Sequence, residues 1–470
     1  MAAWTAHRSI VPRRRPSPLI VPRGGAVSGA ILGLFVLVAT AVAVVVVVIA
    51  PSAGLSDVDL LVFGVSPAVL YAAFRMPVGA LLGLAFVGGP LINYLLIPGN
   101  VGIPWQSGVP VAAAEGVLLV RMLAAGQRPS LRVSEALFLA AIGLALLIGV
   151  VSLADPRVVL SECVETTNLA VLAALLRGRG ITRGELGTLI LAANLALLPF
   201  TLAYLAQSFG LRAVDFVHAQ TPTVVIVNVW VLMGRHGSRW TRLILLVTTM
   251  TFVVALVSAS QRGNFFVAVA GSGVVLAAHS TESVRGAARS VALLLMVSSL
   301  GWLLLPLASE LAPDSIARLS EGTSARTFTL RVTEAEDALS EATATPWGLG
   351  LGAVIDARSA YDPSDEEVRV VSVAGTFIHD SYAWYAAKTG FFGLVTMLMM
   401  VATALLAGLR MMREPERAGE GQLAVVLLTT SCIGAIGGPA LHGFYYTTWA
   451  AVGLALATPA HARARSHARG

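Results

Sequence analysis

Long blocks of apolar residues without charge are the feature that most restricts how this chain folds. Residues 26–50 contain no charged residue, and comparable blocks recur along the chain. About 20 apolar residues cross a bilayer as a helix, and backbone groups inside lipid must bond to one another. Because the blocks are continuous rather than alternating, they indicate helices. The sequence therefore predicts an all-α polytopic membrane protein.

Composition agrees with this prediction. Only 12% of the 470 residues are charged, whereas a soluble domain has about 25%. In a soluble protein the net charge of +6 would favour nucleic acid, but here the charge is explained by membrane topology, and we expect no nucleic-acid partner. The two cysteines, Cys163 and Cys432, lie in apolar segments and predict neither a disulfide nor a metal site.

We predict about 12–14 transmembrane helices. The candidate spans are 26–50, 55–74, 77–98, 108–126, 133–153, 159–176, 185–207, 216–234, 241–259, 263–279, 289–308, 390–409, 422–439 and 442–458. The weakest are 77–98, 159–176 and 216–234, which are short, contain Gly or Pro, or hold an ionisable residue. The first span is longer than the core of a cleavable signal, so we predict that it is retained.

The arginines predict the orientation of these spans. If the N-terminus is cytoplasmic and the spans alternate, most arginines fall in the inside segments. The short outside loops then hold only Arg157, Arg212 and Arg262. Cytoplasmic loops are enriched in Lys and Arg, so both termini are expected in the cytoplasm. The predicted parts of the chain are a basic tail (1–25), a helix bundle (26–308), an extracytoplasmic loop (309–389), C-terminal membrane helices (390–458) and a second basic tail (459–470).

The long loop 309–389 differs in character from the rest of the chain, because it holds half of the acidic residues. Loops of this length are usually functional or disordered. Residues 329–342 predict a helix, and residues 345–352 (TPWGLGLG) predict a glycine-rich turn. The acidic stretch 361–367 predicts a solvated segment. The aromatic segment 377–390 suits the membrane interface.

No soluble-enzyme motif is present, because the sequence has no Walker A element, no HExxH and no CxxC pair. The remaining candidates are cations and a histidine on the outer side. Arg262 is either an arginine that reaches the interface or an anion-binding residue facing a cavity. Arg331 is either a solvated helix charge paired with Glu334 or Asp337, or an anion clamp, since guanidinium suits phosphate geometry.

His379 is either a structural histidine or a general base, because histidine is the residue type best suited to proton transfer at neutral pH. Its neighbour Asp380 either orients the ring or is solvated. Further polar residues at the outer ends of spans could line the same cavity, although a structural role is favoured for each: Asp215, His218, His442 and Tyr445.

Several of these residues also form an ordered set of motifs. The first part consists of Arg331, Ala338–Leu339, Pro346 and Gly348-Leu349-Gly350. The later parts are His379-Asp380-Ser381-Tyr382 and Lys388-Thr389-Gly390-Phe391-Phe392-Gly393, and an upstream element is Ser258-Ala259-Ser260-Gln261-Arg262-Gly263. In order and spacing this set resembles the O-antigen ligase / O-antigen polymerase family of bacterial membrane glycosyltransferases, over roughly residues 255–410. The chain departs from that pattern at Asp380, where asparagine is usual, at Lys388, where an acidic residue is common, and at Ala335, where an aromatic residue is expected.

The resemblance implies a transfer reaction on the outer side of the plasma membrane, without a metal or other cofactor. The donor is a glycan on a polyprenyl diphosphate, and the acceptor is a hydroxyl on a glycan or lipid. By this resemblance His379 is the base, Arg262 and Arg331 bind the diphosphate, and Asp380 and Tyr382 support them. Membrane lipids are the other expected partners.

Two other functions remain open from the sequence. A transporter or flippase of lipid-linked sugars would use ionisable residues within spans, of which Glu115, Glu162 and Glu165 are the main ones. A scaffold without catalytic activity would tolerate alanine at the loop charges. The sequence does not separate ligase from polymerase.

Overall fold

The structure is a computed structural model, and it describes part of the chain. The described residues are 74–83, 104–205, 211–234, 238–258, 262–280, 326–358, 372–375, 378–414, 416–436, 440–441 and 444–457. Both predicted tails, the predicted spans 26–50 and 289–308, and the acidic stretch 361–367 lie outside the described residues.

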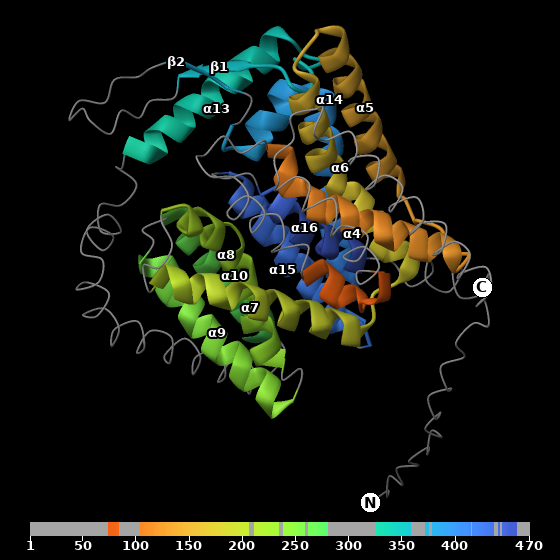
Figure 1. The fold of residues 1–470 in the computed structure, drawn as a ribbon, viewed down its shortest axis with the longest axis vertical. Helices are drawn as coiled ribbons and strands as arrows, with labels where there is room; N and C mark the ends of the chain where they lie inside the picture. The colour runs from red at the N-terminus through yellow and green to blue at the C-terminus, as the bar shows by residue number, and fades with distance from the viewer. Residues whose placement is uncertain are drawn as a thin grey trace, which may run out of the picture.

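Helices form nearly all of the described chain (Figure 1). They are α4 (Pro104–Ala124), α5 (Val133–Val151), α6 (Pro156–Arg179), α7 (Arg183–Leu205), α8 (Leu211–Gly234), α9 (Arg239–Ser258), α10 (Arg262–Ser280), α13 (Arg326–Ala344), α14 (Ser381–Met411), α15 (Ala418–Ala435) and α16 (Phe444–Leu456). The strands β1 (Ile355–Arg358) and β2 (Ser372–Gly375) pair antiparallel, with Ile355 opposite Gly375. This hairpin lies between α13 and α14, in the predicted loop.

Five of the described helices are long and apolar enough to cross a membrane. They are Val133–Val151, Val158–Arg179, Arg239–Leu256, Ser381–Met411 and Ala418–Ala435, and shorter apolar helices cover Thr221–Gly234, Val267–Leu276 and Thr447–Leu456. The predicted class, an all-α polytopic membrane protein, is confirmed. Two spans that looked weak in the sequence, 159–176 and 216–234, are both helical.

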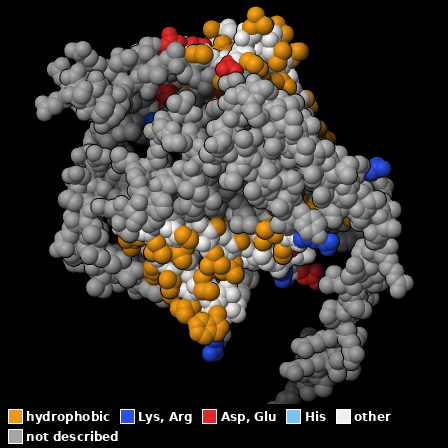
Figure 2. Space-filling model, viewed as in Figure 1, with side chains coloured by type: hydrophobic (Ala, Val, Ile, Leu, Met, Phe, Trp, Pro, Cys, Tyr) orange, Lys and Arg blue, Asp and Glu red, His pale blue; other side chains and the backbone are white. Residues whose placement is uncertain are grey.

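The surface of the bundle carries apolar faces on these helices. On α5, Phe138 and Ile142 are buried, whereas Leu147 and Val151 are exposed. Figure 2 shows the same contrast, because hydrophobic side chains cover much of the visible described surface at both ends of the view. A soluble protein rarely exposes apolar patches of this extent. The exposed faces therefore suit contact with acyl chains.

The helices pack into a bundle with the loop elements at one end. Helix α14 contacts α5, α15 and α13, and α6 contacts α16, α4 and α5. Figure 1 shows α13 and the two strands at the upper end, with α7 and α9 at the lower end. The described residues of the predicted loop therefore gather at one end of the molecule.

Arginines join the helix ends at the opposite end of the bundle. Arg177 of α6 binds Glu135 of α5 with N–O distances of 2.5 and 2.7 Å, and both side chains are buried. Arg177 also donates to the carbonyl of Leu454, and Arg132 donates to the carbonyl of Ala457. The last carbonyls of a helix lack partners within the helix, so these guanidinium groups complete the end of α16. Alternation of the spans predicts that these ends share one side.

Candidate active site

His379 and Glu334 form a pair at the loop end of the bundle. The His379 Nδ1 atom lies 2.9 Å from Oε2 of Glu334, and the same oxygen lies 3.5 Å from the backbone nitrogen of His379. The Glu334 side chain is 9% exposed, whereas that of His379 is 42% exposed. A mostly buried carboxylate therefore holds one nitrogen of an imidazole that solvent can reach.

The spacing of residues along helix α13 places the Glu334 carboxylate on the buried face of this helix. Glu334, Ala338 and Ala342 recur every four residues and are all buried, so they share one face. This face packs where α13 meets α14 and β1. The helix predicted over 329–342 is confirmed, with bounds Arg326–Ala344.

Arg331 lies one turn before Glu334 on the same helix. Residues three apart on a helix are surface neighbours, so the half-buried Arg331 side chain starts close to the His379–Glu334 pair. Of the two acidic partners considered for Arg331 from the sequence, Glu334 instead binds His379. Sequence reasoning missed Glu334 as a site residue. The signal for it was a lone carboxylate in register with the alanines of the buried face.

One interpretation of the sequence had Asp380 orient the histidine ring, but in the structure Asp380 caps a helix instead. Its Oδ1 atom accepts a hydrogen bond from the backbone N–H of Ala383 at 2.8 Å, which makes Asp380 the N-cap of α14. Burial raises the pKa of Asp380, and the N–H groups of Ala383 and Tyr382 oppose that shift. Asparagine is an equally good N-cap, so an aspartate at this position keeps the capping role.

Tyr382 links α14 to the neighbouring helix. Its hydroxyl donates to the carbonyl of Cys432 on α15 at 2.9 Å. Nearby, Tyr385 donates to the carbonyl of Leu441, and Ser381 accepts from the backbone N–H of Leu441. These bonds hold the connection between α15 and α16 on the first turns of α14.

The aromatic segment predicted over 377–390 is mostly buried within the bundle, and its position relative to the membrane interface stays a prediction. Helix α14 begins at Ser381, and the residues from Ala383 to Gly390 are buried. Trp384 packs edge-on against Tyr385 with ring centroids 5.3 Å apart. The aromatic residues fill the core because the segment is covered by α5, α13 and α15.

The glycine-rich turn has a structural role, because its backbone bonds to several helices. Its successive backbone N–H groups all have acceptors: Gly348 donates to Thr345, Leu349 to Ala387, Gly350 to Lys388, Leu351 to Ala145 and Gly352 to Glu162. Backbone N–H groups that cradle a phosphate must be free to point at it. Because these groups are already satisfied, the predicted turn is confirmed as a turn but does not form a phosphate-binding loop.

A break in α14 receives this turn. Gly390 has φ of 68°, which favours glycine. A Cβ atom on Gly348 would lie 2.5 Å from the nitrogen of Gly390, so the two backbones touch. Just after the break, the backbone N–H of Phe391 donates to the carbonyl of Pro346 in the turn at 3.1 Å.

Lys388 forms a buried ion pair beneath the turn. Its Nζ atom lies 2.8 Å from Oε1 of Glu162 on α6 and 2.5 Å from the carbonyl oxygen of Ala353. The Lys388 side chain is fully buried. Lysine at this position, where the family pattern often has an acidic residue, is therefore matched by a carboxylate from another helix.

The other candidates are described only in part. Arg262 begins α10, and its side chain lies outside the description. A Cβ on Gly434 of α15 would lie 3.9 Å from Val267 of α10, and Tyr382 contacts Cys432 on the same α15 end. The first turns of α10 therefore lie at the same end of the bundle as His379. The side chains of the remaining polar candidates also lie outside the described residues: Asp215, His218, His442 and Tyr445.

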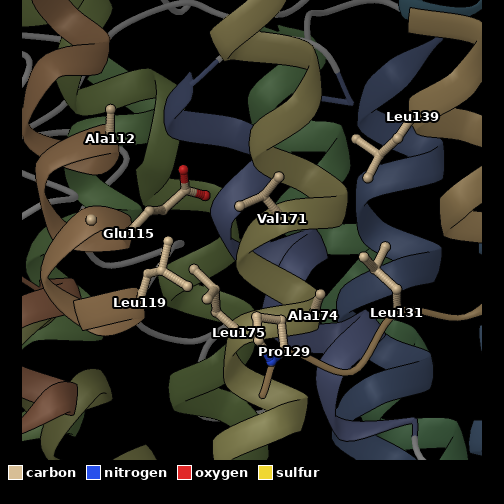
Figure 3. Close-up of a pocket in the computed structure, with 10 residues that line it drawn as sticks. Ala112, Glu115, Leu119, Pro129, Leu131, Leu139, Val171, Ala174 and Leu175 are labelled. Atoms are coloured by element: carbon tan, nitrogen blue, oxygen red, sulfur yellow. The ribbon is translucent and has the colours of Figure 1, made fainter. Parts of the chain in front are cut away.

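A separate pocket lies towards the opposite end of the bundle (Figure 3). It encloses about 360 Å³ between α4, α5 and α6, with Pro129 and Leu131 of the α4–α5 connection in its wall. Figure 3 shows the Glu115 carboxylate among apolar side chains, and within the described structure its Oε1 atom is buried without a hydrogen-bond partner. The connection at Pro129 immediately precedes Arg132, so this pocket is distinct from the His379 site.

The bundle and the polar end together define the class of protein. It is a multi-pass membrane protein that holds a histidine–glutamate pair on elements at one end of its helices. Residues 244–398 match the family model described as O-Antigen ligase, so this part of the chain is similar to the O-antigen ligase family. The match spans Arg262, Arg331, Glu334 and His379, and the family resemblance predicted from the motifs is confirmed. Among curated proteins, none matches the chain.

Proposed function

We propose that this protein is a membrane glycosyltransferase that moves a glycan from a polyprenyl-diphosphate carrier to an acceptor hydroxyl. The reaction takes place at the outer side of the bacterial inner membrane, with both termini in the cytoplasm. The observation that carries the proposal is the His379–Glu334 pair beside Arg331, within the stretch that matches the O-antigen ligase family.

The proposed chemistry balances with groups in the protein. The acceptor oxygen attacks the anomeric carbon of the glycan, and the bond from that carbon to the diphosphate oxygen breaks. The hydroxyl proton moves to His379, which acts as the general base. The polyprenyl diphosphate leaves with the bonding electrons, and cations already in place stabilise its developing charge. Arg331 and Arg262 take that role, so the reaction needs no metal.

The apolar surface of the bundle suits the donor. A polyprenyl tail stays in the bilayer while its diphosphate reaches the water interface, where the loop end of the bundle lies. Exposed apolar side chains on α14 near this end include Phe391 and Phe392, which follow the buried turns below His379. The donor therefore reaches the site from the side, through lipid.

A transporter is less well supported by the placement of charges in the described spans. Glu162 is paired with Lys388, and Glu165 accepts a hydrogen bond from Ser161 at 3.2 Å. Glu115, the third candidate, lies in the separate apolar pocket towards the opposite end of the bundle. A fixed ion pair that joins two helices and the glycine-rich turn suits stability better than alternating access. A flux assay with purified protein separates the two functions, because a transferase changes the covalent product and a transporter does not.

We expect His379→Ala and Arg331→Ala each to abolish glycan transfer, because one loses the base and the other loses a diphosphate contact. The measurement is mass analysis of product formed by purified protein in vesicles that contain lipid-linked glycan. Arg413→Ala is the matched control, since Arg413 is exposed beyond the other end of α14 and should transfer normally. Full product from both site variants would refute the proposal.

A deletion strain distinguishes the two acceptor types. Loss of long glycan chains with single units retained indicates a polymerase. Full-length glycan that accumulates on the lipid carrier indicates a ligase.

A further inference from the structure

We infer that Glu334 is the positioning residue for His379, and that it fixes the ring so that Nε2 receives the proton in glycan transfer. This inference rests on the proposed function and adds to it a residue that the motifs do not include. It is argued from the contact between the two side chains and from the burial of one of them.

Among the described residues of the loop, the Glu334 carboxylate bonds to His379. Its Oε2 atom lies 2.9 Å from Nδ1 of His379 and 3.5 Å from the backbone nitrogen of the same residue. One carboxylate oxygen therefore approaches both the ring and the main chain of His379, which restricts the ring to one orientation. Because Glu334 sits on the buried face of α13, its own side chain has little freedom to move.

The hydrogen-bond chemistry assigns the tautomer. A carboxylate only accepts hydrogen bonds, so Nδ1 of a neutral imidazole must carry the hydrogen. The acceptor lone pair is then on Nε2, and that nitrogen takes the proton from an attacking hydroxyl. When the ring becomes positively charged, the nearby carboxylate stabilises it. An oriented histidine with a carboxylate behind it recurs among hydrolases on unrelated folds.

A purely structural role for Glu334 makes different predictions. A glutamate that only held α13 to the loop would, when replaced, lower the amount of folded protein or weaken donor binding. A positioning residue instead lowers kcat while KM for the lipid-linked donor stays the same, because the loss is confined to the transition state. The protonation pattern of the His379 ring changes only in the second case.

The test compares Glu334→Leu and Glu334→Gln in the full-length protein reconstituted with lipid-linked glycan. Glutamine can still accept a hydrogen bond from Nδ1 but lacks the charge, whereas leucine has neither the acceptor nor the charge. We expect kcat to fall about 10-fold for Glu334→Gln, which keeps the hydrogen bond, and roughly 100-fold or more for Glu334→Leu. The larger loss reaches the range of about 10²–10⁴ that general-base catalysis contributes. Glu336→Leu is the matched control, because Glu336 is exposed on the same helix and should leave kcat unchanged.

A spectroscopic measurement tests the inference in variants whose kcat is too low to measure or whose yield of folded protein is small. Nitrogen-15 labelling of histidine rings, with the His379 signals assigned by their loss in His379→Ala, reports the tautomer directly. We expect protonated Nδ1 in the wild type and in Glu334→Gln, and a mixture of tautomers in Glu334→Leu. The inference is overturned if Glu334→Leu keeps the wild-type tautomer, or if its kcat stays within about twofold of the wild type. Absence of transfer by the wild type would refute the proposed function, whereas transfer by wild type and Glu334→Leu alike would refute only the role of Glu334.

Discussion

Two acidic residues lie next to His379 in space or in sequence, and the structure gives them different tasks. Glu334 is distant in the sequence and contacts the ring, whereas Asp380 is adjacent and caps a helix. The Asp380 side chain is committed to capping the helix that begins after it. Proximity in sequence is therefore a poor guide to which carboxylate serves the base.

The capping role of Asp380 predicts a graded effect of substitution. Asp380→Ala should cost about 0.5–2 kcal/mol of stability because the N–H of Ala383 loses its acceptor. Asp380→Asn should retain the cap. Thermal unfolding of detergent-solubilised protein measures both, and an equal loss of stability in the two variants would contradict the assignment.

The same pair of variants carries a pH dependence. Burial raises the pKa of Asp380 in the folded protein, so the folded state holds that proton more tightly than the unfolded state. The contribution of this group to stability is therefore present at low pH and falls as pH rises through the folded-state pKa. The difference in Tm between Asp380→Asn and the wild type should accordingly move in favour of Asp380→Asn with increasing pH.

At the scale of elements, the break in α14 decides how the loop docks. Interrupting the helix at Gly390 exposes the carbonyls of Ala387 and Lys388, which accept from the glycine-rich turn. The same glycine-rich turn also donates backbone hydrogen bonds to Ala145 of α5 and Glu162 of α6. The broken helix thus anchors the loop to three membrane helices directly below His379.

Replacing the glycine at this break tests its importance. A Cβ on Gly390 would meet the carbonyl oxygen of Pro346, and left-handed backbone costs an ordinary residue roughly 1–2 kcal/mol. We therefore expect Gly390→Ala to lower Tm and to reduce glycan transfer. Gly143→Ala on α5 is the matched control, because a Cβ there meets no atom within 4 Å, and alanine is the better helix former. A Gly390→Ala protein as stable as Gly143→Ala would show that the break is not required.

At the scale of the whole molecule, charge and packing agree on which helix ends lie together. Arg183 at the start of α7 donates to the carbonyl of Glu416, between α14 and α15, and Arg177 joins α5, α6 and α16 at the same end. Figure 2 shows most of the visible Lys and Arg side chains in the lower half of the molecule, away from α13. The arginines that predict a cytoplasmic side also hold that side together.

The orientation itself is open to direct measurement. In a protein with Cys163 and Cys432 replaced by serine, we expect Ser340→Cys on α13 to react with a membrane-impermeant maleimide added outside right-side-out vesicles. Gln127→Cys, in the α4–α5 connection, should react only after the membrane is opened. Both positions are exposed in the structure, so a difference in labelling reports sidedness. The reverse pattern would invert the topology and place the proposed reaction in the cytoplasm.

The sequence by itself determined the fold class and the order of the motifs. Uncharged blocks long enough to cross a bilayer have one common solution, because backbone groups in lipid must be satisfied within the segment. The helix and the glycine-rich turn of the loop were also predictable, since both depend on residues close together in the chain. Arg331 and His379 were identified as candidates by residue type and by resemblance to the O-antigen ligase family.

Only the tertiary structure decided which groups meet. Glu334 contacts a histidine 45 residues later, and Glu162 meets a lysine 226 residues later. Local patterns carry no information about such distant pairs, because each pair depends on how α13, α6 and α14 pack. The burial of the aromatic segment at the start of α14 has the same cause, because its composition suits a surface or a core and only the neighbouring helices cover it.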